Sequence, residues 1–210
     1  MLSPAQILQE FITLWVVIDP IGTLPVFIAV TAGMSAHQRR AVAVRAVIVS
    51  FVVLALFIVL GQVVLDALGL ALPAFQIAGG IVLFLFALTM IFGHSKPEEE
   101  IAEAERVRQT SVFPVAIPSI ASPGAMLTVV ILTDNDRFAI AHQAVTTALM
   151  ALVLAVTLGI MLAASPLLRV IGTTGAAVIS RVMGMLLAAV AVDAVLRAFV
   201  SIGVLPSFSG

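Results

Sequence analysis

Long apolar stretches separated by short polar ones run along the whole chain. A helix rises about 1.5 Å per residue and needs about 20 apolar residues to cross the hydrocarbon core of a membrane. Six stretches reach about that length, and the stretch 70–92 contains no charged residue. We therefore predict an all-α membrane fold with six transmembrane helices, at residues 7–30, 42–65, 70–92, 111–133, 144–167 and 174–202.

Helix-breaking residues interrupt the first and the fourth of these segments. Proline lacks the backbone donor of a helix and clashes with the preceding turn, so both helices should be discontinuous. The second, third and fifth segments have no such interruption and should be plain spans. The interruptions consist of Asp19, Pro20, Gly22 and Pro25 in the first segment and of Pro114, Pro118, Pro123 and Gly124 in the fourth.

The two halves of the chain resemble each other. The run 11–26, FITLWVVIDPIGTLPV, aligns with the run 113–129, FPVAIPSIASPGAMLTV, and both contain a Pro-Gly break. Because each half has three spans, an odd number, the second copy must enter the membrane from the other side, which gives inverted repeats. We expect one transmembrane domain over 1–210, with repeats at about 1–93 and 111–210 and a loop at about 94–110.

Basic residues are unevenly distributed over the polar connections. The stretch 94–109 is strongly polar and should be a solvated loop. Cytoplasmic loops of membrane proteins are enriched in Lys and Arg, so the basic side should be cytoplasmic and both termini outside the cytoplasm. The expected location is the inner (plasma) membrane. The residues of the basic side are Arg39, Arg40, Arg45, Lys96, Arg106, Arg108 and Arg169.

Composition supports a membrane protein and excludes several other classes. The chain is 62% hydrophobic and only 10% charged, with a mean hydropathy of +1.24, whereas soluble domains carry about 25% charge. A net charge of −1 gives no support for a nucleic-acid partner, and the absence of cysteine removes thiol chemistry. His37, His94 and His142 show no metal-site spacing. Without a hydrolase, kinase or phosphate-loop motif, we expect no enzyme activity and no cofactor.

The two interruptions predict a binding site. Each lies about halfway along its segment, so both should meet near the middle of the membrane. Backbone groups left unpaired in hydrocarbon are tolerated only where they are buried in protein or line a cavity. The start of a half-helix suits a carboxylate, and the carbonyls at the end of a half-helix suit an ammonium or a cation. A zwitterion would match such a pair of helix ends.

Asp19 is the most informative residue of the predicted site. An acid inside a span normally marks a pathway or a proton relay, but Asp19 could equally cap the second half-helix with Pro20 at its first position. Gln76 could bind a solute or join helices, and Asp193 and Arg197 are spaced for a helix ion pair. The predicted substrate-binding residues are Asp19, Pro20, Gly22, Thr23, Gln76, Ser119, Ser122, Pro123, Gly124 and Thr128.

These motifs resemble those of the MarC family of bacterial and archaeal membrane proteins, also called UPF0056. The first-helix pattern stands at 19–27 as DPIGTLPVF, the fourth-helix pattern at 122–130 as SPGAMLTVV, and an Arg-x-x-Gly pattern at 181–184. The resemblance covers essentially the whole chain. Ser122 stands where glycine is common in the family, and Asp193 where an uncharged polar residue is expected. The resemblance implies a relation to transporters of small neutral amino acids.

Together these features predict a secondary transporter of a small neutral amino acid, such as glycine or alanine, working by alternating access. The expected partners are that solute, a coupling proton or sodium ion, and the lipid bilayer. Two alternatives stay open: an exporter or channel for another small metabolite, and a non-transporting scaffold or accessory subunit. The sequence also leaves open whether the chain forms a homo-oligomer.

Overall fold

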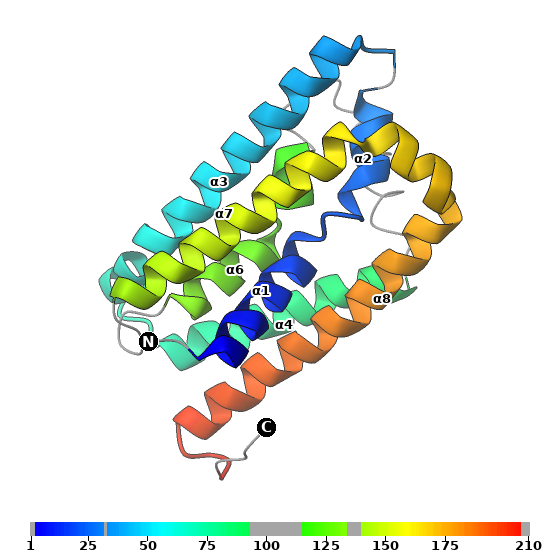
Figure 1. The fold of residues 1–210 in the computed structure, drawn as a ribbon. Helices are drawn as coiled ribbons and strands as arrows, with labels where there is room; N and C mark the ends of the chain where they lie inside the picture. Colours follow the sequence, from blue (N-terminus) through cyan, green and yellow to red (C-terminus); the bar gives the residue numbers. More distant parts are fainter. Residues whose placement is uncertain (1–2, 32, 93–114, 134–139, 207–210) are drawn as a thin grey trace.

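The computed structural model describes residues 3–31, 33–92, 115–133 and 140–206 of the 210-residue chain. All regular secondary structure in these ranges is helical. The predicted loop at 94–110, with the basic residues Lys96, Arg106 and Arg108, lies outside them. The elements are α1 (Pro4–Ile18), α2 (Thr23–Val30), α3 (Ala36–Ala67), α4 (Leu72–Phe92), the π-helical η1 (Val115–Ile120), α6 (Pro123–Leu132), α7 (Ile140–Leu162) and α8 (Ala164–Ser201) (Figure 1).

Four helices in the described ranges are long and apolar enough to cross a membrane. They are α3, α4, α7 and the part of α8 from Ala177 to Ser201. Only 22% to 33% of the most apolar window of each is buried inside the protein. Val59, Leu85 and Met185 are 66%, 58% and 57% exposed, which a soluble protein seldom allows over a large area. The prediction of a helical membrane protein is thus confirmed at this level.

The first predicted segment is broken in its middle, as expected. α1 ends at Ile18 and α2 begins at Thr23. Asp19 has a left-handed backbone conformation, with φ 49° and ψ 66°. That conformation ends a helix, and the following Pro20 has no amide proton with which to continue one.

The fourth predicted segment is broken as well. η1 ends at Ile120, and α6 begins at Pro123. Within η1, Ile117 has an extended backbone with φ −132° and ψ 124°. A proline follows it in the sequence, and the residue before a proline disfavours helical backbone. The predicted segment begins at 111, but residues 111–114 lie outside the described ranges.

The junction between the fifth and sixth segments differs from the prediction. α7 ends at Leu162 rather than at residue 167, and α8 already begins at Ala164. Pro166 is tolerated in the first turn of α8 because its missing amide proton would have no partner within the helix. α8 bends at Gly172, with φ 72° and ψ 164°. The predicted loop that carries Arg169 is therefore wrong, since the chain is helical up to this glycine.

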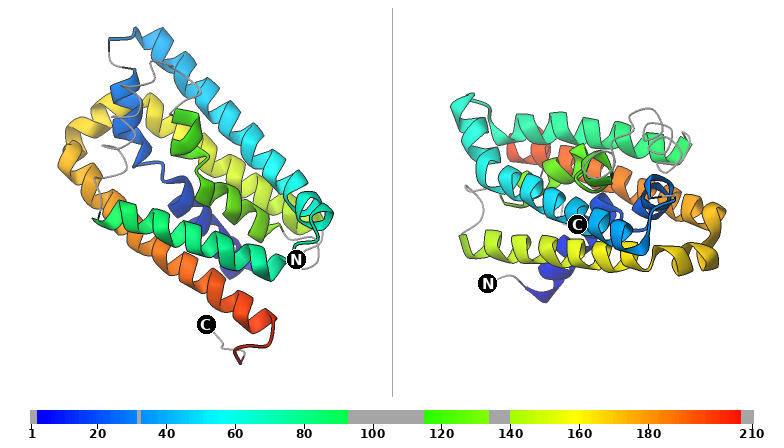
Figure 2. Two further views of the ribbon diagram at one scale, coloured as in Figure 1. Left: turned by 180° about the vertical axis from the view of Figure 1, so that it is seen from behind. Right: turned by 90° about the horizontal axis from the view of Figure 1, so that it is seen from above.

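The helices of the two halves pair with each other. α3 lies beside α7, and α4 lies beside α8 (Figure 1). The broken segments, α1–α2 and η1–α6, lie between these pairs and contact helices of both (Figure 2). Their side chains form much of the core, where Leu14, Ile18, Leu24 and Ile120 are fully buried. The start of α1 and the end of α8 lie at the same end of the bundle (Figure 1).

Two glycines allow α4 and α8 to pack closely. A Cβ atom on Gly80 would lie 3.0 Å from the backbone oxygen of Ala191, and one on Gly184 would lie 3.2 Å from that of Ala87. Small residues at such contacts let the backbones of membrane helices approach each other. The packing is reciprocal, because Ala87 follows Gly80 in the sequence by the same spacing as Ala191 follows Gly184.

Candidate functional site

Asp19 organises the break between α1 and α2. Its amide donates to the backbone oxygen of Trp15 at 3.0 Å, and its Oδ1 accepts a hydrogen bond from the amide of Gly22 at 3.0 Å. The hydroxyl of Thr23 donates to the backbone oxygen of Asp19 at 3.1 Å. Asp19 thus ends α1 and shapes the turn. The prediction that Pro20 opens the second half-helix is wrong, because the turn extends through Gly22 and α2 begins at Thr23.

Ser122 caps the start of α6. Its Oγ accepts a hydrogen bond from the amide of Ala125 at 3.1 Å, and Pro123 stands in the first turn of the helix. The predicted combination of a serine cap and a proline is therefore confirmed. On the other side of the break, the amide of Ala121 donates to the backbone oxygen of Ala116 at 2.9 Å.

The two breaks are in direct contact. The hydroxyl of Ser119 donates to Oγ1 of Thr23 at 3.2 Å, and the hydroxyl of Ser122 lies 3.4 Å from the backbone oxygen of Val17. Val17 is in the last turn of α1, where carbonyl groups have no partner within the helix. Residues about one hundred positions apart therefore satisfy each other's polar groups, as the mirrored positions of the breaks predict.

The contact between the breaks is closed to solvent. Thr23, Ser119 and Ser122 are 0% exposed, and Asp19 is 2% exposed. Among the predicted site residues, Pro123 is exposed, while the others are buried: Asp19, Pro20, Gly22, Thr23, Gln76, Ser119, Ser122, Gly124 and Thr128. The hydroxyl groups that join the two breaks are therefore not accessible to solvent in this conformation.

Three further predicted site residues, Gln76, Gly124 and Thr128, are buried on α4 and α6. Gln76 of α4 is 2% exposed, and its Oε1 accepts no hydrogen bond from the described residues. Thr128 of α6 is 3% exposed and lies about one turn after Gly124. A Cβ atom on Gly124 would collide with the side chain of Leu83, so this glycine allows α6 to approach α4. A role in ligand binding stays a prediction for Gln76 and Thr128.

The contact combines helix ends of opposite polarity. The end of α1 carries a partial negative charge and the start of α6 a partial positive one. Asp19 adds an acidic group to the side of α1, and Ser119, Ser122 and Thr23 add hydroxyl groups. Such a set can bind both an ammonium and a carboxylate. Within the described ranges, no three His, Cys, Asp or Glu side chains form a group that could hold a metal ion.

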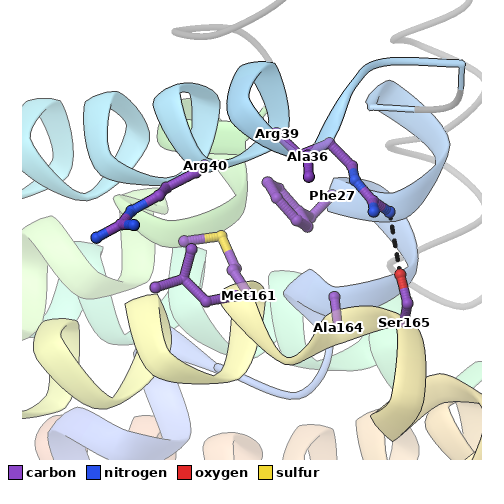
Figure 3. Close-up of a pocket in the computed structure, with 8 residues that line it drawn as sticks. Phe27, Ala36, Arg39, Arg40, Met161, Ala164 and Ser165 are labelled. Atoms are coloured by element: carbon purple, nitrogen blue, oxygen red, sulfur yellow. Dashed lines mark hydrogen bonds between the residues drawn. The ribbon is translucent and has the colours of Figure 1, made fainter.

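A hollow of about 100 Å³ lies where α2, α3, α7 and α8 meet (Figure 3). Nη1 of Arg39 donates to Oγ of Ser165 at 3.0 Å across it, so a residue of the first half holds one of the second. The start of α3 lies at the end of the bundle away from the start of α1 (Figure 1). The hollow is lined by Phe27, Ala36, Arg39, Arg40, Met161, Leu162, Ala164 and Ser165.

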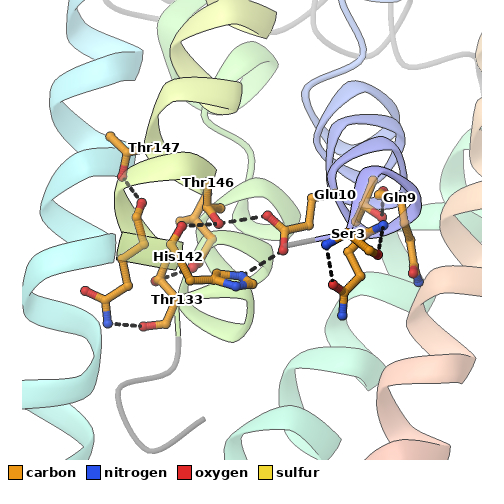
Figure 4. A network of polar contacts seen from close by, with 11 residues as sticks. Ser3, Gln9, Glu10, Thr133, His142, Thr146 and Thr147 are labelled. Atoms are coloured by element: carbon orange, nitrogen blue, oxygen red, sulfur yellow. Dashed lines mark hydrogen bonds and ion pairs between the residues drawn. The ribbon is translucent and has the colours of Figure 1, made fainter. Parts of the chain in front are cut away.

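The sequence reasoning missed a buried pair formed by Glu10 and His142. Nε2 of His142 lies 2.8 Å from Oε1 of Glu10 (Figure 4). His142 lies in the first turn of α7. An acid inside an apolar segment is a signal that could have identified Glu10, as it identified Asp19. The predicted pair of Asp193 and Arg197 is confirmed at 2.6 Å.

Comparison with known proteins gives consistent matches over nearly the whole chain. The model of the family described as "MarC family integral membrane protein" matches residues 5–202. A UPF0056 membrane protein of Archaeoglobus fulgidus is 33% identical over 187 residues, 88% of this chain and 87% of that protein. No solved structure matches.

Two bacterial UPF0056 proteins also match this chain over most of its length. The UPF0056 membrane protein YvbG of Bacillus subtilis is 35% identical over 191 residues, 89% of this chain and 90% of its own length. The UPF0056 inner membrane protein YhgN of Escherichia coli is 31% identical over 184 residues, 87% of this chain and 90% of its own length.

Proposed function

The chain belongs to the MarC family of integral membrane proteins, and from this premise we propose that it is a secondary transporter of a small neutral amino acid such as glycine or alanine. The observation that carries the proposal is the contact between the two helix breaks, in which Ser119 meets Thr23 and Ser122 meets Val17. Discontinuous helices that face each other inside a membrane protein are typical of the binding sites of secondary transporters.

Six spans in two inverted repeats form the framework of this proposal. Four spans are the long apolar helices, and the broken segments α1–α2 and η1–α6 supply the other two. Support for the repeat comes from the reciprocal packing of Gly80 on Ala191 and of Gly184 on Ala87. A local two-fold axis relating the two halves would produce this pattern, in which the same pair of positions is used twice. Inverted repeats can exchange conformations and so open a central site to each side in turn.

The polar groups at the breaks suggest how a zwitterion would be held. Its ammonium would bind at the end of α1, near Asp19 and the backbone oxygen of Val17. Its carboxylate would bind at the start of α6, where Ser122 and the first backbone amides lie. Ser119 and Thr23 now close this position, so they must separate when the solute enters. In the transport cycle that we propose, the conformation in which Ser119 contacts Thr23 is the occluded state.

The proposed orientation places Arg39, Arg40 and Arg45 on the cytoplasmic side of the inner membrane and both termini on the other side. The hollow beside Arg39 and Ser165 then lies on the cytoplasmic side, and its bridging hydrogen bond would have to change when that side opens. Coupling to a proton or to sodium would supply the driving force.

Uptake into proteoliposomes tests the proposal. Liposomes containing the purified protein should accumulate labelled glycine or alanine faster than protein-free liposomes, and unlabelled solute inside should accelerate exchange. Counterflow with other small metabolites distinguishes an amino-acid transporter from an exporter of a different solute. Absence of uptake and of counterflow for every small amino acid, by protein that remains folded, would contradict the proposal.

One observation favours a second function, that of a non-transporting scaffold. Thr23, Ser119 and Ser122 have no exposed surface, so the breaks could serve only to shape the packing of the bundle. In that case the contact between Ser119 and Thr23 would be permanent. Whether this contact has to open for activity is therefore the property that separates the two functions.

A further inference from the structure

A buried acid–base cluster joins the two halves of the chain at the end of the bundle where α1 starts. Glu10 of α1 is only 7% exposed, and its Oε1 lies 2.8 Å from Nε2 of His142 on α7. Its other oxygen, Oε2, accepts a hydrogen bond from the hydroxyl of Thr146 at 2.8 Å (Figure 4). Nearby, the side-chain Nε2 of Gln143 donates to the backbone oxygen of Thr133 at 3.1 Å, directly after the end of α6.

The burial of two ionisable side chains, Glu10 and His142, suggests a functional role for them. An ionisable group inside a membrane protein is costly, and such groups usually mark ion or proton pathways. The side chains of His142 and Glu10 are 12% and 9% exposed, so the cluster is almost closed but keeps a small accessible surface. The proposed site at the breaks does not use either residue.

Thr146 can serve the cluster in two states of protonation. With Glu10 ionised, the hydroxyl of Thr146 donates to Oε2, the geometry seen at 2.8 Å. With a proton on Oε2, Glu10 would donate to Oγ1 of Thr146, whose own proton can turn to the backbone oxygen of His142 at 3.2 Å. Nε2 of His142 lies 2.8 Å from Oε1, and it carries a proton when the imidazole is charged or is the neutral Nε2–H tautomer. The cluster can therefore gain or lose a proton without leaving Glu10 or Thr146 unpaired.

The helices packed against α1 and α7 carry further acids and bases. α3, which packs against α7, carries His37, Arg39, Arg40, Arg45 and Asp66. Glu10 is the only acidic or basic side chain of α1, His142 is the only one of α7, and α6 has none. α8, which also packs against α1, carries Asp193 and Arg197, whose side chains are about half exposed and bound to each other at 2.6 Å. The remaining charged residues of α8 are Arg169 and Arg181.

We propose that Glu10, His142 and Thr146 form the proton-binding site of the transporter, so that the coupling ion is a proton. The inference rests on the proposed transport function. α1 is an unbroken helix from the cluster to Asp19, a rise of about 13 Å over nine residues. A proton added to or removed from Glu10 changes how α1 is held against α7. The same rigid helix ends at the solute site, which links proton binding to the opening of the breaks.

Two measurements on the full-length protein test this site. In proteoliposomes, an inward proton gradient should stimulate uptake of glycine or alanine by the wild type, and Glu10→Gln and His142→Gln should lose this stimulation. In infrared spectra recorded in deuterated water, the wild type should show a buried carboxyl band that depends on pH and is missing in Glu10→Gln.

Control variants distinguish proton binding at Glu10 from amino-acid transport. Asp193→Asn removes an exposed acid of α8 and should keep both the stimulation and the band. Thr146→Val keeps the shape of the side chain and should move the pH at which the band appears, which covers the case that Glu10→Gln does not fold. If the wild type shows the band but takes up no amino acid, the proton site stands and the transport function fails. Stimulation that survives in Glu10→Gln, or a band unchanged in that variant, overturns the inference.

Discussion

Asp19→Asn is expected to lower uptake of glycine or alanine by roughly tenfold to hundredfold while the protein stays folded. Asparagine keeps an oxygen that can accept the hydrogen bond of the Gly22 amide, and it tolerates the left-handed backbone at φ 49°. What it removes is the charge next to the proposed ammonium position. A hydrogen bond to a charged group contributes about 1.5–3 kcal/mol, which corresponds to that range of affinity.

Asp19→Ala is the matched variant for stability. Alanine cannot accept the hydrogen bond from the buried amide of Gly22, a loss of about 1–3 kcal/mol, and it is disfavoured in the left-handed region by about 1–2 kcal/mol. Thermal unfolding in detergent should therefore show a clear decrease in stability for Asp19→Ala and little change for Asp19→Asn. If Asp19→Asn takes up amino acids as fast as the wild type, the carboxylate has a structural role alone.

Gly80→Leu is expected to destabilise the pairing of α4 with α8 strongly. A Cβ atom at this position would lie 2.6 Å from Cγ2 of Val195 and 3.0 Å from the backbone oxygen of Ala191, and backbone cannot move aside as a side chain can. Overpacking of this kind costs about 1–3 kcal/mol, and sometimes more. The midpoint of thermal unfolding in detergent should fall accordingly, and Gly184→Leu should have a similar effect because its contact is the reciprocal one.

Gly159→Leu is the control for this prediction. Gly159 lies in α7, is exposed, and has no atom within 4 Å of the place where a Cβ would stand. Leucine has the higher helix propensity, so this variant should be as stable as the wild type or slightly more stable. Equal stability of Gly80→Leu and Gly159→Leu would show that the close approach of α4 and α8 does not occur in the membrane protein.

Local chemistry explains which parts of the fold could be predicted from the sequence. The breaks near Pro20 and Pro123 follow from the missing amide proton of proline, and the cap at Ser122 follows from the preference of serine for that position. These effects act over a few residues. They were less informative at the junction of α7 and α8, where the predicted span 144–167 runs through Pro166, whereas the structure places Pro166 in the first turn of a new helix.

Contacts between distant residues explain most of what the sequence did not reveal. Glu10 and His142 are far apart along the chain, and nothing near either of them indicates that they meet. The contact of Ser119 with Thr23 was within reach of prediction because the repeat places the two breaks at matching positions. Gln76 is buried, as its apolar neighbours in the sequence predict. Burial alone does not indicate whether its side chain binds a solute.

A pair of cysteines at the contact between the breaks tests the central claim most directly. The chain has no cysteine of its own, so Thr23→Cys/Ser119→Cys introduces the only two thiols, at positions whose hydroxyl oxygens lie 3.2 Å apart. Oxidation to a disulfide should abolish amino-acid uptake by this variant, and a reductant should restore it, while the two single variants should be insensitive to both treatments. Undiminished uptake by the fully cross-linked protein would contradict the account, because the solute would then cross without any separation of the two breaks.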